Sequence, residues 1–113
     1  MDRLLVGDVG FGKTEVAFNA AYLSLQNKRQ VVLISPLVVL AHEHFSKAQE
    51  RFASLGIRIE ILTRLQSQAH ATRVLQGLAN GTIDMVIGTH RLLSEKIQWK
   101  RLGLLIVDEE HKF

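Results

Sequence analysis

The fold of this chain is decided by Gly7-Asp8-Val9-Gly10-Phe11-Gly12-Lys13-Thr14, a stretch near its start. The order G-x-x-x-x-G-K-T is that of a Walker A loop. Its glycines let the backbone curl so that successive N–H groups point at phosphate oxygens. Lys13 can then reach the β- and γ-phosphates, and the Thr14 hydroxyl can ligate Mg²⁺. We therefore expect residues 7–14 to bind the phosphates of a nucleotide.

The surroundings of this loop fit the same interpretation. Apolar residues 4–6 predict a short strand that enters the loop, and residues 15–26 predict a helix that leaves it. Phosphate at a helix N-terminus gains from the free N–H groups and from the helix dipole. A glycine-rich turn that matches the pattern by chance is the alternative, and it would not explain the strand, the loop and the helix together.

The rest of the chain alternates short apolar runs with longer helical periods. The predicted strands are residues 31–34, 57–61, 85–87 and 104–107, and the predicted helices are residues 37–52 and 67–79. Asn80-Gly81 is expected to end the second of these helices as a C-cap. Strand–helix alternation with short connections predicts an α/β fold, a parallel-sheet P-loop NTPase core with three αβα layers. Ligands of such sheets bind beyond the carboxyl ends of the strands.

An acidic run, Asp108-Glu109-Glu110-His111, follows the last predicted strand directly. Asp108 suits Mg²⁺, which often takes one carboxylate together with phosphate and water. Glu109 would then orient or deprotonate the water that attacks the γ-phosphate, because phosphoryl transfer depends mostly on positioning and charge. The alternative is a solvated helix start, which acidic residues also favour. A preceding Walker A loop favours the functional interpretation.

Composition limits the remaining possibilities. The chain has 113 residues, a formal net charge of +3 and no cysteine. This length predicts one domain at most, and the absence of cysteine excludes disulfides and Cys-ligated zinc. No apolar run approaches the ~20 residues that span a bilayer, and no signal peptide is found. We expect a cytoplasmic protein with no membrane partner.

Several isolated residues permit two interpretations. His42, Glu43 and His44 lack H-E-x-x-H spacing, so we do not expect a metal site there. Trp99 could stack on a base or a partner, or it could cover the edge of a core. His70 is expected to be solvated.

The combination of a Walker A loop with D-E-x-H resembles the first, RecA-like motor domain of superfamily 2 DExH helicases and translocases. Within that superfamily, residues 7–17, Gly88-Thr89-His90 and residues 102–111 most closely resemble the bacterial transcription-repair coupling factors. The RecG fork helicases are second, because they usually have a small residue in place of Phe11 and Gln in place of Glu110. The resemblance extends over essentially all of the chain.

This resemblance implies an ATP- and Mg²⁺-dependent translocase that moves on double-stranded DNA and displaces a stalled RNA polymerase. It implies that Lys13, Asp108 and Glu109 are catalytic and that His111 couples ATP hydrolysis to movement. It also implies that Thr89, His90 and residues 36–44 face DNA. A hydroxyl and an N–H at Thr89 could contact a phosphate, but on sequence alone Thr89 could equally cap a helix.

The sequence departs from the family pattern on the DNA side. Leu37 and Val38 stand where the family commonly has two threonines, and Lys112 stands in place of an arginine, which loses the bidentate fork. Contact with DNA near Leu37 would therefore rely on backbone N–H groups. We expect weak, salt-sensitive DNA binding by this chain.

The resemblance further implies that residues 1–113 are a partial helicase ATP-binding domain, truncated and without a second motor domain. In such folds a strand that follows D-E-x-H lies between the strands at residues 4–6 and 104–107, so we expect a gap there with unpaired backbone groups. We expect the chain alone to be inactive. Two other hypotheses are a RecG-type fork helicase domain and a nucleotide-binding remnant without catalysis.

Overall fold

The computed structural model describes the backbone of residues 4–7, 14–94 and 96–108, and the side chains of residues 16–92 and 96–108. Strands and helices alternate along the chain, as the sequence predicts. The strands are β1 (Leu4–Gly7), β2 (Gln30–Ile34), β3 (Ile59–Leu62), β4 (Met85–Gly88) and β5 (Leu102–Asp108). The helices are α1 (Thr14–Gln26), α2 (Val38–Phe52), the 3₁₀ turn η1 (Ala53–Leu55), α3 (Gln68–Asn80) and α4 (Arg91–Ser94).

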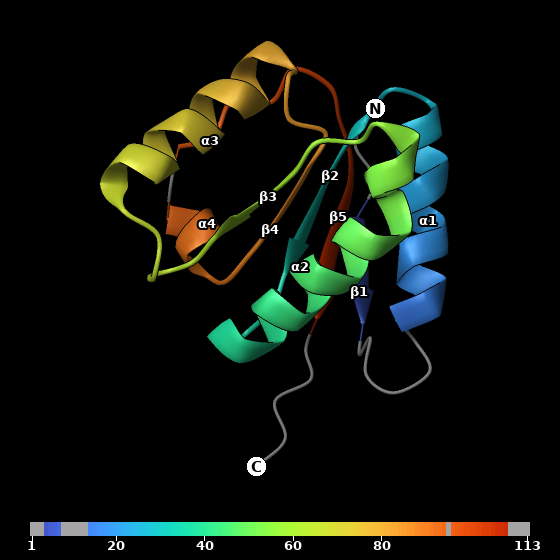
Figure 1. Ribbon diagram of the computed structural model, residues 1–113, viewed down its shortest axis with the longest axis horizontal. Coiled ribbons are helices and arrows are strands. Elements are labelled where there is room, and N and C mark those ends of the chain that lie inside the picture. Colours follow the sequence, from blue (N-terminus) through green and yellow to red (C-terminus); the bar gives the residue numbers. More distant parts are fainter. Residues whose placement is uncertain (1–3, 8–13, 95, 109–113) are drawn as a thin grey trace.

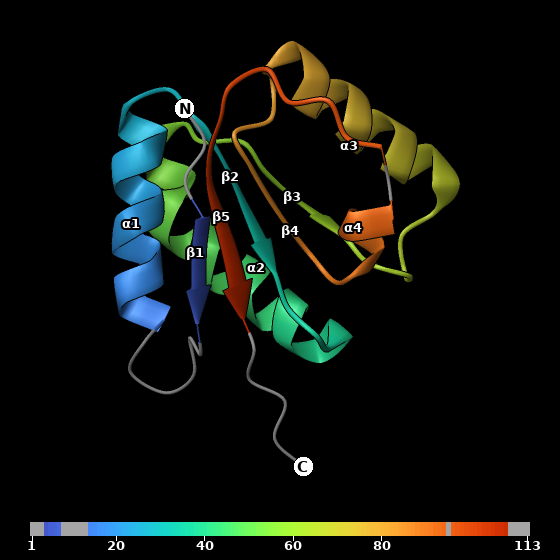
Figure 2. The ribbon, with the colours of Figure 1, turned by 180° about the vertical axis from the view of Figure 1, so that it is seen from behind.

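All strand pairs are parallel, in the order β1-β5-β2-β4-β3. The expected gap between the first and last strands was wrong, because β1 pairs directly with β5 from Leu4↔Leu105 to Gly7↔Asp108 (Figure 2). The physical reason is that the N–H and C=O groups along the edge of β5 need partners, and β1 supplies them. The predicted parallel α/β fold is confirmed.

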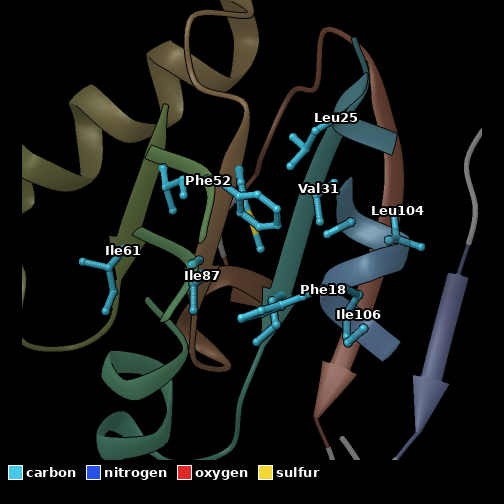
Figure 3. Close-up of a cluster of buried hydrophobic side chains, with 14 of the residues drawn as sticks. Phe18, Leu25, Val31, Phe52, Ile61, Ile87, Leu104 and Ile106 are labelled. Carbon is cyan, nitrogen blue, oxygen red and sulfur yellow. The ribbon is translucent and has the colours of Figure 1, made fainter. Parts of the chain in front are cut away.

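Each face of the sheet buries its own apolar cluster, which gives the three predicted layers. Figure 1 shows α2 lying across the front of the strands with α1 beside it, and Figure 2 shows α2 behind them. These two helices cover Val31, Ile61 and Leu104 of the sheet, with Phe18 and Phe52 in contact at 6.0 Å between ring centroids (Figure 3). The opposite face packs against α3 and α4. Because side chains alternate along a strand, the central strands β2, β4 and β5 are apolar on both sides.

The ends of α3 follow the predicted capping chemistry. The Ser67 hydroxyl accepts a hydrogen bond from the His70 N–H at 3.1 Å, which caps the first turn. Gly81 ends the helix at φ 87°, a left-handed conformation that favours glycine. The predicted C-cap at Asn80-Gly81 is therefore confirmed. The short elements η1 and α4 were not predicted, since three or four residues carry too little periodicity.

Two predictions for isolated side chains have clear outcomes. His70 is not simply solvated, because its Nε2 lies 2.9 Å from the Ile61 carbonyl oxygen and 3.8 Å from the Glu60 carboxylate. Trp99 packs, half-buried, against the apolar cluster beneath α3, which supports the core-edge interpretation.

Among the residues that the structure describes, no helix is long and apolar enough to cross a membrane.

A buried glutamine joins three segments at the start of β2. The Nε2 group of Gln30 donates to the carbonyl oxygens of Leu78 and Ile83, both at 2.9 Å. Its Oε1 accepts from the Arg101 N–H at 2.9 Å, and the residue is 3% exposed. One side chain therefore satisfies backbone groups from three separate parts of the fold.

We expect Gln30→Ala to lower the free energy of unfolding by about 2 kcal/mol, because it removes the side-chain partner of the Ile83 carbonyl oxygen and of the Arg101 N–H. Urea denaturation followed by circular dichroism measures this loss. The control is Gln26→Ala, which removes only an exposed hydrogen bond to the Tyr22 hydroxyl and should change the free energy by less than about 0.5 kcal/mol. Equal effects of the two substitutions would contradict the assignment.

Candidate functional site

The carboxyl ends of β1 and β5 lie side by side. Gly7, the last residue of β1, is the register partner of Asp108, the last residue of β5 (Figure 2). The Walker A sequence begins at Gly7, and α1 begins at Thr14. The two motifs therefore meet at one edge of the sheet, where ligands of parallel α/β sheets bind.

Several predicted site residues lie outside the described part of the chain. These are Asp8, Val9, Gly10, Phe11, Gly12, Lys13, Glu109 and His111. The structure therefore describes the two ends of the loop, Gly7 and the start of α1 at Thr14, together with Asp108. The roles assigned to all these residues remain predictions.

Asp108 is buried, and it contacts a residue from another layer of the fold. Its side chain is 2% exposed, and its Oδ2 lies 3.0 Å from Nε2 of His44. His44 belongs to α2, which packs on the sheet through Ala41, Ala48 and Phe52. An ionised carboxylate can only accept hydrogen bonds, so the partner of an ionised Asp108 is the N–H form of His44 Nε2.

Sequence reasoning did not find His44 as a part of this site. In the sequence, His44 falls on an apolar stripe of the predicted helix, at three- and four-residue spacing with Leu37, Leu40, Ala41, Phe45, Ala48 and Phe52. The spacing of His42, Glu43 and His44 does not suit a metal site. The usable signal was a polar side chain within an otherwise apolar stripe, because such a group needs a buried partner. In the part of the chain that the structure describes, no group of three or more His, Cys, Asp or Glu side chains could hold a metal ion.

A row of buried polar residues continues from Asp108 along the same edge. Ile34, Leu62 and Gly88 are register partners near the ends of neighbouring strands, and Ile34 also pairs with Val107. The next residue on each of these four strands is polar and at most 8% exposed: Ser35, Thr63, Thr89 and Asp108. At this edge of the sheet, buried polar residues therefore extend from β5 across β2 and β4 to β3.

Gly88 is required for the close approach of β4 to β3 at this edge. A Cβ atom at Gly88 would overlap the Leu62 carbonyl oxygen and lie 2.7 Å from Leu92 Cδ1. Of the two predicted DNA contacts that follow it, Thr89 is buried, whereas His90 is exposed. His90 is therefore the more accessible of the two side chains.

The first turn of α2 presents apolar side chains to solvent. Leu37 is 40% exposed and Val39 is 62% exposed, and the Leu37 side chain makes no capping hydrogen bond. Polar contacts at this turn would have to come from backbone N–H groups, as expected from the sequence.

A cavity of about 590 Å³ lies at the opposite end of the sheet, lined in part by Gln30, Gly81 and Asp84. It is near the amino ends of the strands, away from Gly7 and Asp108. We therefore do not assign the nucleotide to this cavity.

Comparison with known proteins agrees with this architecture. The family model "DEAD/DEAH box helicase" matches residues 1–113. The chain is 50% identical over all of its 113 residues to the transcription-repair-coupling factors of Escherichia coli K12 and Bacillus subtilis 168, and it covers 10% of each. A solved structure, "Structure of RecG bound to three-way DNA junction", matches the whole chain at 40% identity with a TM-score of 0.83, over 16% of that protein.

The chain thus spans about a tenth of the length of the curated relatives that it matches. The family model and these relatives agree over its whole length, and the predicted superfamily is confirmed. The chain belongs to the DEAD/DEAH box helicase family.

Proposed function

We propose that this chain is the ATP-binding part of an ATP-dependent DNA translocase that acts in transcription-coupled DNA repair. The observation that carries the proposal is the 50% identity to coupling factors over all 113 residues. Identity to the RecG structure over the same length is 40%. Double-stranded DNA would be the track, and a stalled RNA polymerase would be the partner of the whole protein.

The residues at the edge of β1 and β5 supply the parts that phosphoryl transfer needs. The backbone N–H groups of residues 7–12 would bind the phosphates, and Lys13 would neutralise charge on the β- and γ-phosphates. Thr14 and Asp108 would hold Mg²⁺, since hard oxygen donors suit this ion and Asp108 is a buried carboxylate. Bound Mg²⁺ would polarise the phosphoryl oxygens. Glu109 would orient the attacking water, and His111 would couple hydrolysis to movement.

A second candidate is a fork-remodelling helicase of the RecG type. It is favoured by the TM-score of 0.83 to a RecG structure solved with a three-way DNA junction. Both candidates share the nucleotide chemistry and differ in the substrate of the whole protein.

The full-length protein should release a stalled RNA polymerase from duplex DNA in an ATP-dependent manner. The reason is that its sequence identity to the coupling factors, 50%, is higher than its identity to the RecG structure, 40%. Release is measured by gel shift of a polymerase halted by nucleotide omission. Lys13→Ala is the control and should abolish release. If the protein remodels a model fork but leaves the halted polymerase in place, the RecG-type function replaces this proposal.

A further inference from the structure

We propose that His44 is a positioning residue, which holds the Asp108 carboxylate in the orientation that Mg²⁺-nucleotide binding requires. This inference rests on the proposed function, since it takes Asp108 as a metal ligand. It adds a residue from α2 to a site that the sequence assigns only to the Walker A loop and the D-E-x-H run.

The contact has the geometry of a well-formed hydrogen bond. His44 Nε2 and Asp108 Oδ2 are 3.0 Å apart, with the two side chains 8% and 2% exposed. An ionised acceptor makes such a bond stronger than a neutral one. Burial excludes most competing water, so the donor fixes the carboxylate more firmly than solvent would.

The hydrogen bond from His44 is compatible with metal binding by Asp108. His44 Nδ1 is buried without a hydrogen-bond partner among the described residues, whereas Nε2 makes the bond to Asp108. A carboxylate has about four lone-pair sites, so the bond from His44 does not by itself prevent coordination of a metal. Carboxylates that ligate metals commonly accept a hydrogen bond from a second residue that does not itself touch the metal.

Packing of α2 does not depend on this bond. Ala41, Ala48 and Phe52 of the same helix are each at most 1% exposed, and they hold α2 on the sheet on both sides of His44. A buried polar pair adds little net stability over an apolar pair of similar volume. A role in orienting Asp108 therefore accounts for the pair better than a role in anchoring the helix.

The test uses two side chains of similar size in the full-length protein. His44→Gln keeps an N–H donor near the position of Nε2, whereas His44→Met removes it. We measure the Mg²⁺ concentration that gives half-maximal binding of a fluorescent ADP analogue, and also the binding of that analogue without Mg²⁺. His44→Met should raise the required Mg²⁺ at least about tenfold, as loss of an outer partner of a metal ligand does. His44→Gln should stay within about threefold of the unsubstituted protein, and Mg²⁺-free binding should be unchanged in both variants.

The matched control is His70→Met, which removes another histidine hydrogen bond, to the Ile61 carbonyl oxygen, at the edge of β3. It should leave the Mg²⁺ requirement unchanged. Equal Mg²⁺ requirements for His44→Met and His44→Gln would overturn the positioning role. Asp108→Asn and Lys13→Ala separate this failure from that of the proposed function: if neither alters nucleotide binding, the nucleotide site itself is misassigned.

A measurement on the unsubstituted protein covers the case in which His44→Met does not fold. In protein labelled with ¹⁵N at histidine, the ring signals of His44 should shift when Mg²⁺ is added to the ADP complex, and those of His70 should not. An unchanged His44 signal under these conditions contradicts the proposal.

Discussion

Replacing Lys13 with alanine in the full-length protein is expected to lower ATP turnover at least about a hundredfold, as loss of one preorganised charge or donor in an active site commonly does. The reason is that phosphoryl transfer relies on charge stabilisation and positioning, with little covalent chemistry supplied by the protein. Lys13 is the one lysine of the Walker A sequence, and the loop that carries it joins the end of β1 to the start of α1.

Phosphate release in the presence of duplex DNA measures this turnover. Lys100→Ala is the matched control, since Lys100 is exposed and lines the cavity at the opposite end of the sheet. It should leave turnover within about twofold of the unsubstituted protein, in line with the small effect of most surface substitutions. A Lys13→Ala protein that keeps more than a tenth of the activity would remove the lysine from the catalytic set.

The strands and long helices could be predicted because each carries its own local signal. Ile59 and Ile61 alternate as a strand does, and Gly81 stands where a left-handed cap was needed. Parallel strands also end at a common edge, so the predicted sheet placed Asp108 and the Walker A loop at the same edge, although not on neighbouring strands. The element boundaries differ from the predicted ones by one or two residues, as fraying ends do.

The pairing of β1 with β5 could not be predicted in the same way. Both strands are short apolar runs, and nothing within either run specifies its neighbour. The family resemblance suggested an intervening strand, whereas residues 4–7 pair with residues 105–108 without a break. Pairing depends on which strands are available to satisfy open backbone edges, and this is a property of the whole fold.

The contact between His44 and Asp108 could not be predicted from local sequence patterns either. The two residues are 64 positions apart and lie in different layers. Periodicity correctly turned His44 toward the sheet, but it treated that position as apolar. The sequence does not state the order of the strands that α2 crosses. It therefore could not show that His44 lies over the end of β5.

The 113-residue chain by itself is expected to hydrolyse ATP at least about a thousandfold more slowly than the full-length protein. The resemblance to superfamily 2 helicases implies that an arginine stabilises the transition state and that this arginine comes from a second motor domain. Such an arginine raises the rate about 10³–10⁵-fold in related phosphoryl-transfer enzymes. The Walker A and D-E-x-H sequences are not expected to replace it, because their proposed roles are to bind the phosphates, the metal and the attacking water, and none of these supplies that arginine.

A phosphate-release assay on the purified chain and on the full-length protein decides this point, with Lys13→Ala of each as the blank. Far-UV circular dichroism measures the total helix content of the chain, so the rates are compared only for folded material. Turnover of the chain comparable to that of the full-length protein, and abolished by Lys13→Ala, would contradict the prediction. It would mean that an arginine within residues 1–113, from the same or from a second copy, completes the site. Arg64, which follows Thr63, and Arg91, whose Nη1 donates to the Thr63 carbonyl oxygen, would be the first to substitute.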